Sequence, residues 1–215
     1  MTAFNHSLVS PAAFENRYRN DEDPWNYRSS PYERSKYQVT IDSLSRGRFA
    51  NAFEPACSIG ELTAMLAARC DRLLATDVSK TAVRLARERC AGFTNVNIEC
   101  RDLLDELRRT ALEAGHNDCV DSHPDPNDPD ATFDLIVFSE VGYYFDVASV
   151  ALLARSLAAL LRPHGEFVAV HWRGHSPDHV LHGDEVHRTL FDSLPLQHRA
   201  GDYHPGFRLD SWLKS

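Results

Sequence analysis

FEPACSIGELT, residues 53–63, decides the fold, because an apolar run ends within it and a helical pattern begins. The apolar residues that lead into it are typical of a buried strand, and ELTAMLAARC after it is typical of a helix. Small residues stand at every second position of the turn, Ala56, Ser58 and Gly60, so the backbone can approach a ligand closely. In a doubly wound sheet, the turn after the first strand lies where ligands bind. The stretch predicts a cofactor-binding turn, with an ordinary strand-to-helix turn as the alternative.

The same alternation of short apolar runs and helical patterns continues along the chain. Strands are expected at 49–56, 72–78, 94–102, 133–141, 165–172, 196–204 and 206–215. Helices are expected at 61–70, 80–90, 103–115, 147–161, where Arg-Pro-His-Gly closes the helix, and 183–195. Such alternation indicates a parallel sheet covered on both faces, and Pro205-Gly206 joins the last two strands as an antiparallel hairpin. The predicted fold is α/β, a Rossmann-like, doubly wound, mostly parallel seven-stranded sheet with a C-terminal antiparallel hairpin.

The first part of the chain is polar and aromatic, and it differs from the rest. A helix is expected from Tyr32 to Leu44, with Ser30 as its cap and Pro31 in its first turn. The aromatic residues are too many for a free tail, so residues 1–44 are interpreted as a helical lid over the domain formed by 45–215. Packing of this segment on the sheet alone is the alternative.

Composition limits the class of ligand. The chain has 215 residues, a net charge of −8 and 43% hydrophobic residues, which suits one α/β domain. The acidic balance argues against binding nucleic acid, and a small molecule with a cationic part fits better. The longest apolar stretches are too short to span a membrane, and the N-terminus lacks the pattern of a signal peptide. With five cysteines and no C-x-x-C pair, we expect reduced thiols and a cytoplasmic location.

Two further stretches have the composition of a binding site. GHNDCVDSHPDPNDPDAT, residues 115–132, is rich in Asp, Pro and Asn and is interpreted as a disordered or Ω-like excursion, with a partner-binding loop as the alternative. Four histidines lie close together between 171 and 182, but Gly174 and Pro177 break any helix that would align them. No metal site is expected.

Carboxylates follow three of the predicted strands. Glu54 ends the first, Asp77 ends the second and Asp102 follows the third. An anion at position 54 repels a pyrophosphate but attracts an ammonium or, through solvent, a sulfonium group. A carboxylate at position 77 can accept both hydroxyls of a ribose. Because the carboxyl ends of parallel strands share one sheet edge, these acids are expected to converge there.

These residues resemble the class I S-adenosylmethionine-dependent methyltransferases. Their acid-G-x-G-x-G motif matches 54–60, their ribose-binding acid matches Asp77 in ATDVS, and the acid that faces the adenine amino group matches Asp102 in ECRDLL. Within that class, DPWNYRSSPYERSKY and SEVGYYF are most similar to the nodulation protein S group. The resemblance implies S-adenosylmethionine as the methyl donor, S-adenosylhomocysteine as the product, and an amine acceptor, including an amino sugar. The expected donor-binding residues are Trp25, Arg34, Glu54, Ala56, Ser58, Gly60, Asp77, Val78, Asp102, Leu103 and Ser139.

The acceptor is expected beside the ends of the fourth and fifth strands. Glu140 is placed to orient an amine, His171 is the candidate base, and Tyr144 completes the predicted catalytic group. The expected substrate-binding residues are Tyr32, Tyr143, Trp172 and Arg173. His171 and Arg173 also suit an O-methyltransferase for a hydroxylated or carboxylic molecule. A non-catalytic binding module and a dinucleotide-dependent oxidoreductase are further alternatives, and the oligomeric state is left open between monomer and homodimer.

Overall fold

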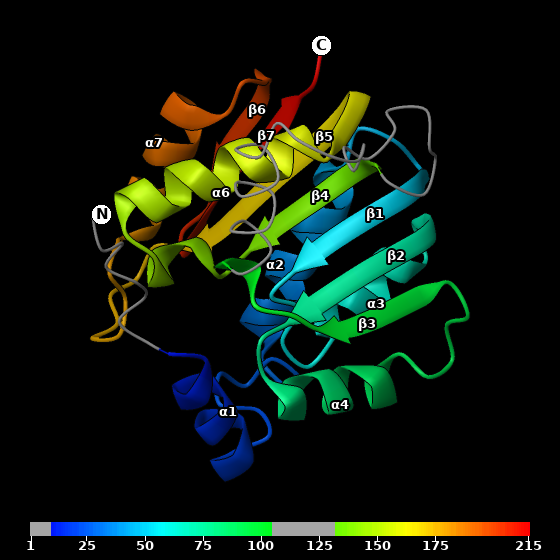
Figure 1. Cartoon of the computed structure of the whole chain (residues 1–215), viewed down its shortest axis with the longest axis vertical. Helices are drawn as coiled ribbons and strands as arrows, with labels where there is room; N and C mark the ends of the chain where they lie inside the picture. The colour runs from blue at the N-terminus through cyan, green and yellow to red at the C-terminus, as the bar shows by residue number, and fades with distance from the viewer. Residues whose placement is uncertain (1–9, 105–131) are drawn as a thin grey trace, which may run out of the picture.

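The computed structural model describes residues 10–104 and 132–215, and their strands form one sheet (Figure 1). The strands are β1 (Phe49–Pro55), β2 (Cys70–Asp77), β3 (Val96–Cys100), β4 (Phe133–Ser139), β5 (Leu161–Trp172), β6 (Gln197–Tyr203) and β7 (Phe207–Leu213). Their order is β3-β2-β1-β4-β5-β7-β6. Strands β1 to β5 are parallel, whereas β7 runs antiparallel to both β5 and β6. The predicted seven-stranded sheet and its closing hairpin are confirmed.

Helices cover both faces of this sheet. They are α1 (Pro11–Asn20), α2 (Pro31–Ser43), α3 (Glu61–Ala67), α4 (Lys80–Arg89), the 3-10 turn η1 (Gly142–Tyr144), α6 (Val147–Ala159) and α7 (Gly183–Ser193). In Figure 1, α6 and α7 lie in front of the sheet, and α2 and α3 lie behind it. Buried side chains of α6 and α7 share one apolar core with β4 and β5, and those of α2 and α3 share a second with β1. Burial on both faces explains why β1 and β4 read as continuous apolar runs.

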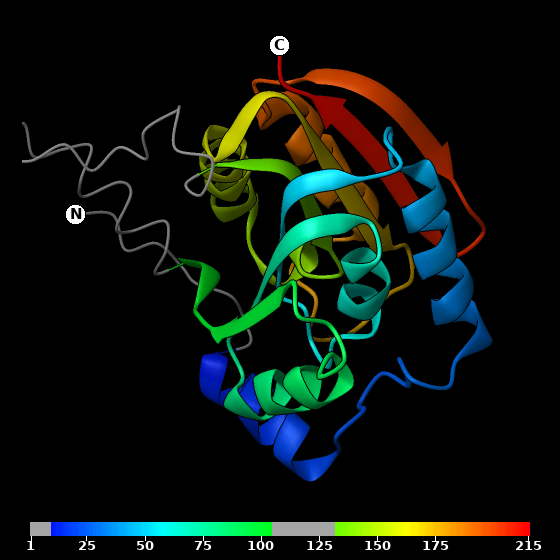
Figure 2. The same cartoon turned by 90° about the vertical axis from the view of Figure 1, so that its right-hand side faces the viewer.

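Two helices form in the polar N-terminal segment. The hydroxyl of Ser30 accepts a hydrogen bond from the backbone N–H of Glu33 at the start of α2, which confirms the predicted cap. Ser10 caps α1 in the same way, with Pro11 in the first turn. The sequence did not predict α1. Figures 1 and 2 show that α1 lies beyond the carboxyl ends of the central strands, next to α4.

The start of β5 differs from the prediction. Arg-Pro-His-Gly was expected to close the preceding helix, but β5 already begins at Leu161, which pairs with Phe133. The register with β4 then shifts by a bulge, and His164 adopts a left-handed φ of 61°. Its backbone N–H donates to the carbonyl of Lys214, so the end of the chain holds the bulge in place.

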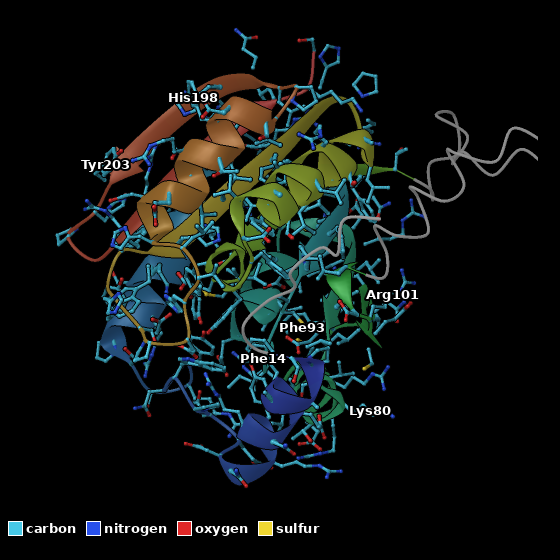
Figure 3. The ribbon with its side chains drawn as sticks, turned by 60° about the vertical axis from the view of Figure 1, so that its left-hand side comes forward. Phe14, Lys80, Phe93, Arg101, His198 and Tyr203 are labelled. Atoms are coloured by element: carbon cyan, nitrogen blue, oxygen red, sulfur yellow. The ribbon has the colours of Figure 1, made fainter. Side chains whose placement is uncertain are left out.

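The hairpin leaves β6 exposed along its whole length at the edge of the sheet. His198 and Tyr203 on this strand lie at the opposite end of the molecule from Phe14 on α1 (Figure 3). No helix among residues 10–104 and 132–215 is long and apolar enough to cross a membrane. The stretch at 115–131 and most of the helix predicted at 103–115 lie outside the described residues. Of the cysteines described, Cys57, Cys70 and Cys90 are buried free thiols and Cys100 is an exposed one.

Candidate active site

A cavity of about 380 Å³ opens at the carboxyl ends of β1, β2 and β4, on the side where α1 lies. This volume falls within the range of small-molecule sites, roughly 300–1,000 Å³. Strand-end acids and lid aromatics line it together. The sequence-predicted residues that line it are Trp25, Glu54, Ala56, Ser58, Asp77, Val78, Asp102, Leu103, Ser139, Glu140 and Tyr144.

The turn after β1 has the backbone shape of a glycine-rich loop, although two of its glycines are replaced. Ala56 and Ser58 adopt left-handed φ angles of 59° and 53°, and Gly60 follows with 83°. A side chain in this region costs about 1–2 kcal/mol per residue. The fold therefore accepts strain at two positions that line the cavity, which is typical of a functional turn.

Gly60 has a different role from the one expected. It does not line the cavity, and it caps α3. A Cβ atom at this position would lie 3.0 Å from the Cα atom of Ala86 on α4. Gly60 therefore permits close packing of α3 against α4, and its contact with the donor stays a prediction.

Asp77 connects the end of β2 to the turn. Its Oδ2 atom accepts a hydrogen bond of 2.9 Å from the backbone N–H of Ser58, and Oδ1 accepts one of 2.9 Å from that of Ser79. Burial raises the pKa of Asp77 to about 6, against the lowering effect of these N–H groups. The carboxylate is thus held in a fixed orientation at the wall of the cavity.

Glu54 presents a buried oxygen that the described residues do not satisfy. The residue is 3% exposed and lines the cavity, and its Oε2 atom has no hydrogen-bond partner. Burial raises the pKa of Glu54 to about 8, although the Thr63 hydroxyl acts in the opposite direction. An unpartnered buried oxygen is costly unless a ligand supplies a donor. The site therefore fits a ligand with an ammonium or N–H group at this wall.

Aromatic residues of the N-terminal segment cover the cavity. The hydroxyl of Tyr18 lies 2.5 Å from that of Ser58, which joins α1 to the turn after β1. Trp25 stacks on Tyr27 with ring centroids 5.7 Å apart, and Phe14 meets the ring edge of Tyr144 at 4.9 Å.

Several of the covering residues were not named as site residues from the sequence. Those that line the cavity are Phe14, Tyr18, Tyr27 and Tyr37. The signal available was the number of aromatic residues in a polar segment, which indicates cover but not which ring points inward.

Glu140 is held at the cavity by contacts on both carboxylate oxygens. The Nζ atom of Lys36 on α2 donates to Oε1 at 2.8 Å, and the hydroxyl of Tyr143 donates to Oε2 at 2.5 Å. Glu140 itself has a left-handed φ of 55°. The predicted placement of Glu140 at the ligand side of β4 agrees with the structure.

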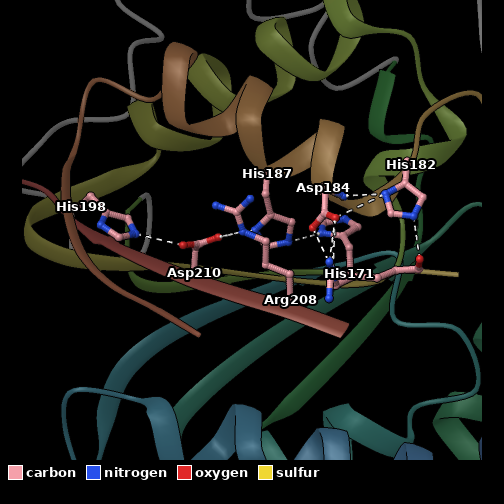
Figure 4. Close-up of polar contacts among 8 residues, drawn as sticks. His171, His182, Asp184, His187, His198, Arg208 and Asp210 are labelled. Atoms are coloured by element: carbon pink, nitrogen blue, oxygen red, sulfur yellow. Dashed lines mark hydrogen bonds and ion pairs between the residues drawn. The ribbon is translucent and has the colours of Figure 1, made fainter. Parts of the chain in front are cut away.

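His171 does not face the cavity, which corrects the prediction of a base. It is fully buried, and its Nε2 atom accepts a hydrogen bond of 3.0 Å from the backbone N–H of Gly142. Its Nδ1 atom lies 3.2 Å from Nε2 of His187, whose Nδ1 lies 2.6 Å from Asp210 (Figure 4). Burial lowers the pKa of His171 well below its usual range. Both ring nitrogens are used to connect β5 to η1 and α7.

Two predicted arginine contacts are also corrected. Arg34 is exposed on α2 and donates to the carbonyl of Ser29, so it lies away from the cavity. Arg173 binds the carboxylate of Asp184 with donor–acceptor distances of 3.0 and 3.1 Å. Its guanidinium group also lies over the ring of Tyr203, 5.1 Å from the centroid.

The remaining predicted substrate residues lie outside the cavity lining. The indole of Trp172 occupies the space that a side chain at Gly174 would need. Tyr32 is 38% exposed and packs edge-on against Phe207. Tyr143 is buried, and it reaches the site through its hydrogen bond to Glu140 and its edge-on ring contact with Tyr144. Within 10–104 and 132–215, no group of three or more His, Cys, Asp or Glu residues is placed to hold a metal ion.

Comparisons with known proteins agree with this geometry. The family model of nodulation protein S (NodS) matches residues 13–111. Nodulation protein S of Rhizobium tropici is 32% identical over 155 residues, which are 71% of this chain and 56% of that protein. The chain thus spans little more than half the length of this curated relative.

Solved structures extend the likeness over nearly the whole chain. A protein from Pseudomonas syringae, assigned as a methyltransferase, is 33% identical and covers 85% of this chain and 99% of its own, with a TM-score of 0.65. The N-methyltransferase NodS from Bradyrhizobium japonicum, solved with S-adenosylhomocysteine, is 23% identical to this chain. The match covers 95% of this chain and 98% of that protein, with a TM-score of 0.72. The latter shows the shared fold. The Pseudomonas syringae protein, at 33% identity and 99% coverage, shows that the chain belongs to the methyltransferases, and the first half of the chain is similar to nodulation protein S.

Proposed function

We propose that this protein transfers the methyl group of S-adenosylmethionine to the nitrogen of a small amine. The observation that carries the proposal is the convergence of Glu54, Asp77 and Asp102 on one cavity at the carboxyl ends of the strands. These carboxylates are distant from one another in the sequence. The order of the parallel strands places them at one edge of the sheet. Cavities at this edge are where open α/β sheets bind their ligands.

The residues of the cavity match the parts of the methyl donor. Glu54 has the unpartnered oxygen that an amino-acid ammonium group would satisfy. Asp77 is assigned to the ribose hydroxyls, and Asp102 to the adenine amino group. When bound, S-adenosylmethionine supplies a methyl group activated by the positive sulfur. The aromatic rings of Trp25 and Tyr18 cover this part of the site, where they exclude water and favour a cation.

The residues at the acceptor side favour an amine over a hydroxyl group. Glu140 offers a carboxylate that accepts an N–H of the amine and aligns its lone pair for transfer. The O-methyltransferase alternative relied on His171 as a base and Arg173 as a carboxylate anchor. His171 is fully buried and both groups are bonded elsewhere, so that alternative has no observation in its favour.

A second part of the proposal concerns residues 1–44, which we assign as a lid. Its described helices contact the binding turn through Tyr18 and the acceptor acid through Lys36. Donor and acceptor sites therefore both depend on this segment.

The test is an assay of methyl transfer with labelled S-adenosylmethionine. A panel of primary amines, amino sugars and matched hydroxyl compounds is supplied, and products are identified by mass spectrometry. The proposal predicts methylated amines and no methylated hydroxyl compounds, and loss of the product in Glu140→Gln with donor binding retained. Transfer to hydroxyl or carboxyl groups alone would refute the amine assignment.

A further inference from the structure

A buried charge cluster lies behind the acceptor side of the cavity. It consists of Glu33 and Lys36 on α2 and of Glu140 at the end of β4, and we call it the α2–β4 cluster. The Nζ atom of Lys36 lies 2.8 Å from Oε2 of Glu33 and 2.8 Å from Oε1 of Glu140. Of the three residues, only Glu140 lines the cavity.

The burial of Lys36 needs an explanation. The side chain is 1% exposed, and taking an ammonium group out of water costs several kcal/mol. Burial acts to lower the pKa of Lys36, but the carboxylates of Glu140 and Glu33 outweigh it and raise the pKa overall. The lysine therefore stays charged between the two acids. Buried ion pairs of this kind are weak sources of stability, so a role in setting the shape of the site is the better explanation.

Glu140 is held both by its backbone conformation and by hydrogen bonds to its two carboxylate oxygens. Its backbone is in the left-handed region, which costs on the order of 1 kcal/mol for a residue other than glycine. Lys36 and Tyr143 each occupy one of its carboxylate oxygens. A charged group held by its surroundings before the ligand arrives is the usual arrangement for binding a developing or permanent opposite charge.

The composition of the cluster also favours a cation. Two carboxylates share one ammonium group, so the cluster itself holds more carboxylates than ammonium groups. Aromatic rings of Tyr27, Tyr37 and Tyr144 line the same cavity, and their faces attract positive charge.

We propose that Lys36 is the positioning residue of the acceptor site. It holds the Glu140 carboxylate toward the nitrogen of a neutral amine, which donates an N–H to that carboxylate, keeps its lone pair for the methyl group and gains positive charge as the carbon–sulfur bond breaks. Glu33 anchors Lys36 from the same helix. Because Lys36 belongs to α2, the acceptor site is complete only when that helix is docked on the sheet. This inference rests on the proposed function. It adds a positioning residue, Lys36, and an acceptor nitrogen that gains positive charge during transfer.

The test uses two donor analogues, so no knowledge of the acceptor is needed. S-Adenosylhomocysteine lacks a group at the transfer position, whereas sinefungin carries an amino group there. We expect wild-type protein to bind sinefungin about tenfold more tightly, as a charge-assisted hydrogen bond to Glu140 allows. Calorimetric titration of Lys36→Met is expected to show this preference reduced to about twofold, with the affinity for S-adenosylhomocysteine unchanged.

Each other outcome has a distinct meaning. If Lys36 only neutralises Glu140, removing it strengthens the preference for sinefungin, and if Lys36 is only structural, both ligands weaken by the same factor; either result overturns the inference. Lys36→Gln, which keeps hydrogen-bond donors in the same space, provides the same comparison if Lys36→Met does not fold. Lys80→Met, at an exposed lysine labelled in Figure 3, is the matched control. Failure of the wild type to bind either analogue would instead refute the proposed function.

Discussion

Ala56 and Ser58 hold backbone conformations that glycine adopts without strain. Replacing Ala56 with glycine removes a cost of about 1–2 kcal/mol but adds about 0.5–1 kcal/mol of unfolded-chain entropy. We therefore expect Ala56→Gly to leave the free energy of unfolding unchanged or to raise it by up to about 1.5 kcal/mol, as measured by urea denaturation. The control is Ala68→Gly, at an exposed residue in the right-handed region, which is expected to lose stability. A clear loss at position 56 would contradict the strain assigned to the turn.

Glu54 gives the stability of the protein a pH dependence. Its pKa is about 8 in the folded protein against an ordinary 4.5, so unfolding releases a proton between these values. Stability contributed by the protonated group is therefore lost as pH rises from 4.5 to about 8, at about 1.4 kcal/mol per unit.

The window from pH 7 to 8 separates this effect from others. It lies above the pKa of Asp77, about 6, and above the ordinary pKa of 6.5 of histidine, whose burial at His171 and His187 makes stability rise with pH below this window. We expect urea denaturation to show the free energy of unfolding falling across this window in the wild type and falling much less in Glu54→Gln. Parallel slopes in the two proteins would exclude Glu54 as the source.

His171 provides a test of a corrected prediction. Replacing it with leucine leaves the Gly142 N–H and a nitrogen of His187 without their partner. The expected cost is about 2–4 kcal/mol of stability, with binding of S-adenosylhomocysteine preserved within about threefold. Urea denaturation and calorimetry measure the two quantities. A stable variant that binds the donor but has lost methyl transfer would restore His171 as a catalytic residue.

Helix α1 is held over the cavity by a few polar contacts. Glu15 accepts hydrogen bonds from the backbone N–H and hydroxyl of Thr81 and from the hydroxyl of Ser79, at the N-terminus of α4. Removal of these contacts in Glu15→Ala is expected to increase amide hydrogen exchange in α1 about tenfold or more, and to speed release of S-adenosylhomocysteine. Exchange in β4 should not change.

The matched variant for α1 is Glu22→Ala, which removes an exposed ion pair with Arg84. Exposed ion pairs contribute little to stability, so amide hydrogen exchange in α1 should remain near the wild-type value. Equal exchange in both variants would show that Glu15 does not hold the helix.

The elements differ in how far the sequence predicted them. Strands β1 and β4 were predicted because burial on both faces demands continuous apolar residues, and the acids that follow them had to meet at one edge. Helix α1 was missed because only Phe14 and Tyr18 of its apolar face contact the domain, and the rest reads as polar.

Fewer of the residues predicted for the acceptor than of those predicted for the donor line the cavity. The direction of a side chain at the end of β5 depends on the alternation of the strand and on the hydrogen-bonding partners that α7 presents. A sequence motif shows neither. His171 therefore contacts His187, and Arg173 binds Asp184, both on α7. The contact of Lys36 with Glu140 was not predicted from the sequence, because nothing in α2 alone indicates an acid 104 residues away.

The molecule as a whole joins two parts of the chain around one cavity. Residues of the N-terminal helices and of the α/β sheet line it together, so neither part holds the complete site. Under the proposed function, donor and acceptor would both bind between these two parts of the chain, and both sites would depend on the docking of the same segment.

The most direct measurement is calorimetric titration of S-adenosylhomocysteine into three proteins: wild type, Asp77→Asn and Asp71→Asn. Asp71 is also on β2 but is exposed and pairs with Arg48. We expect saturable binding to the wild type, at least about tenfold weaker binding to Asp77→Asn, and unchanged binding to Asp71→Asn. No binding to the wild type at about 1 mM ligand, or equal affinity in all three proteins, would contradict a methyl-donor site at this edge of the sheet.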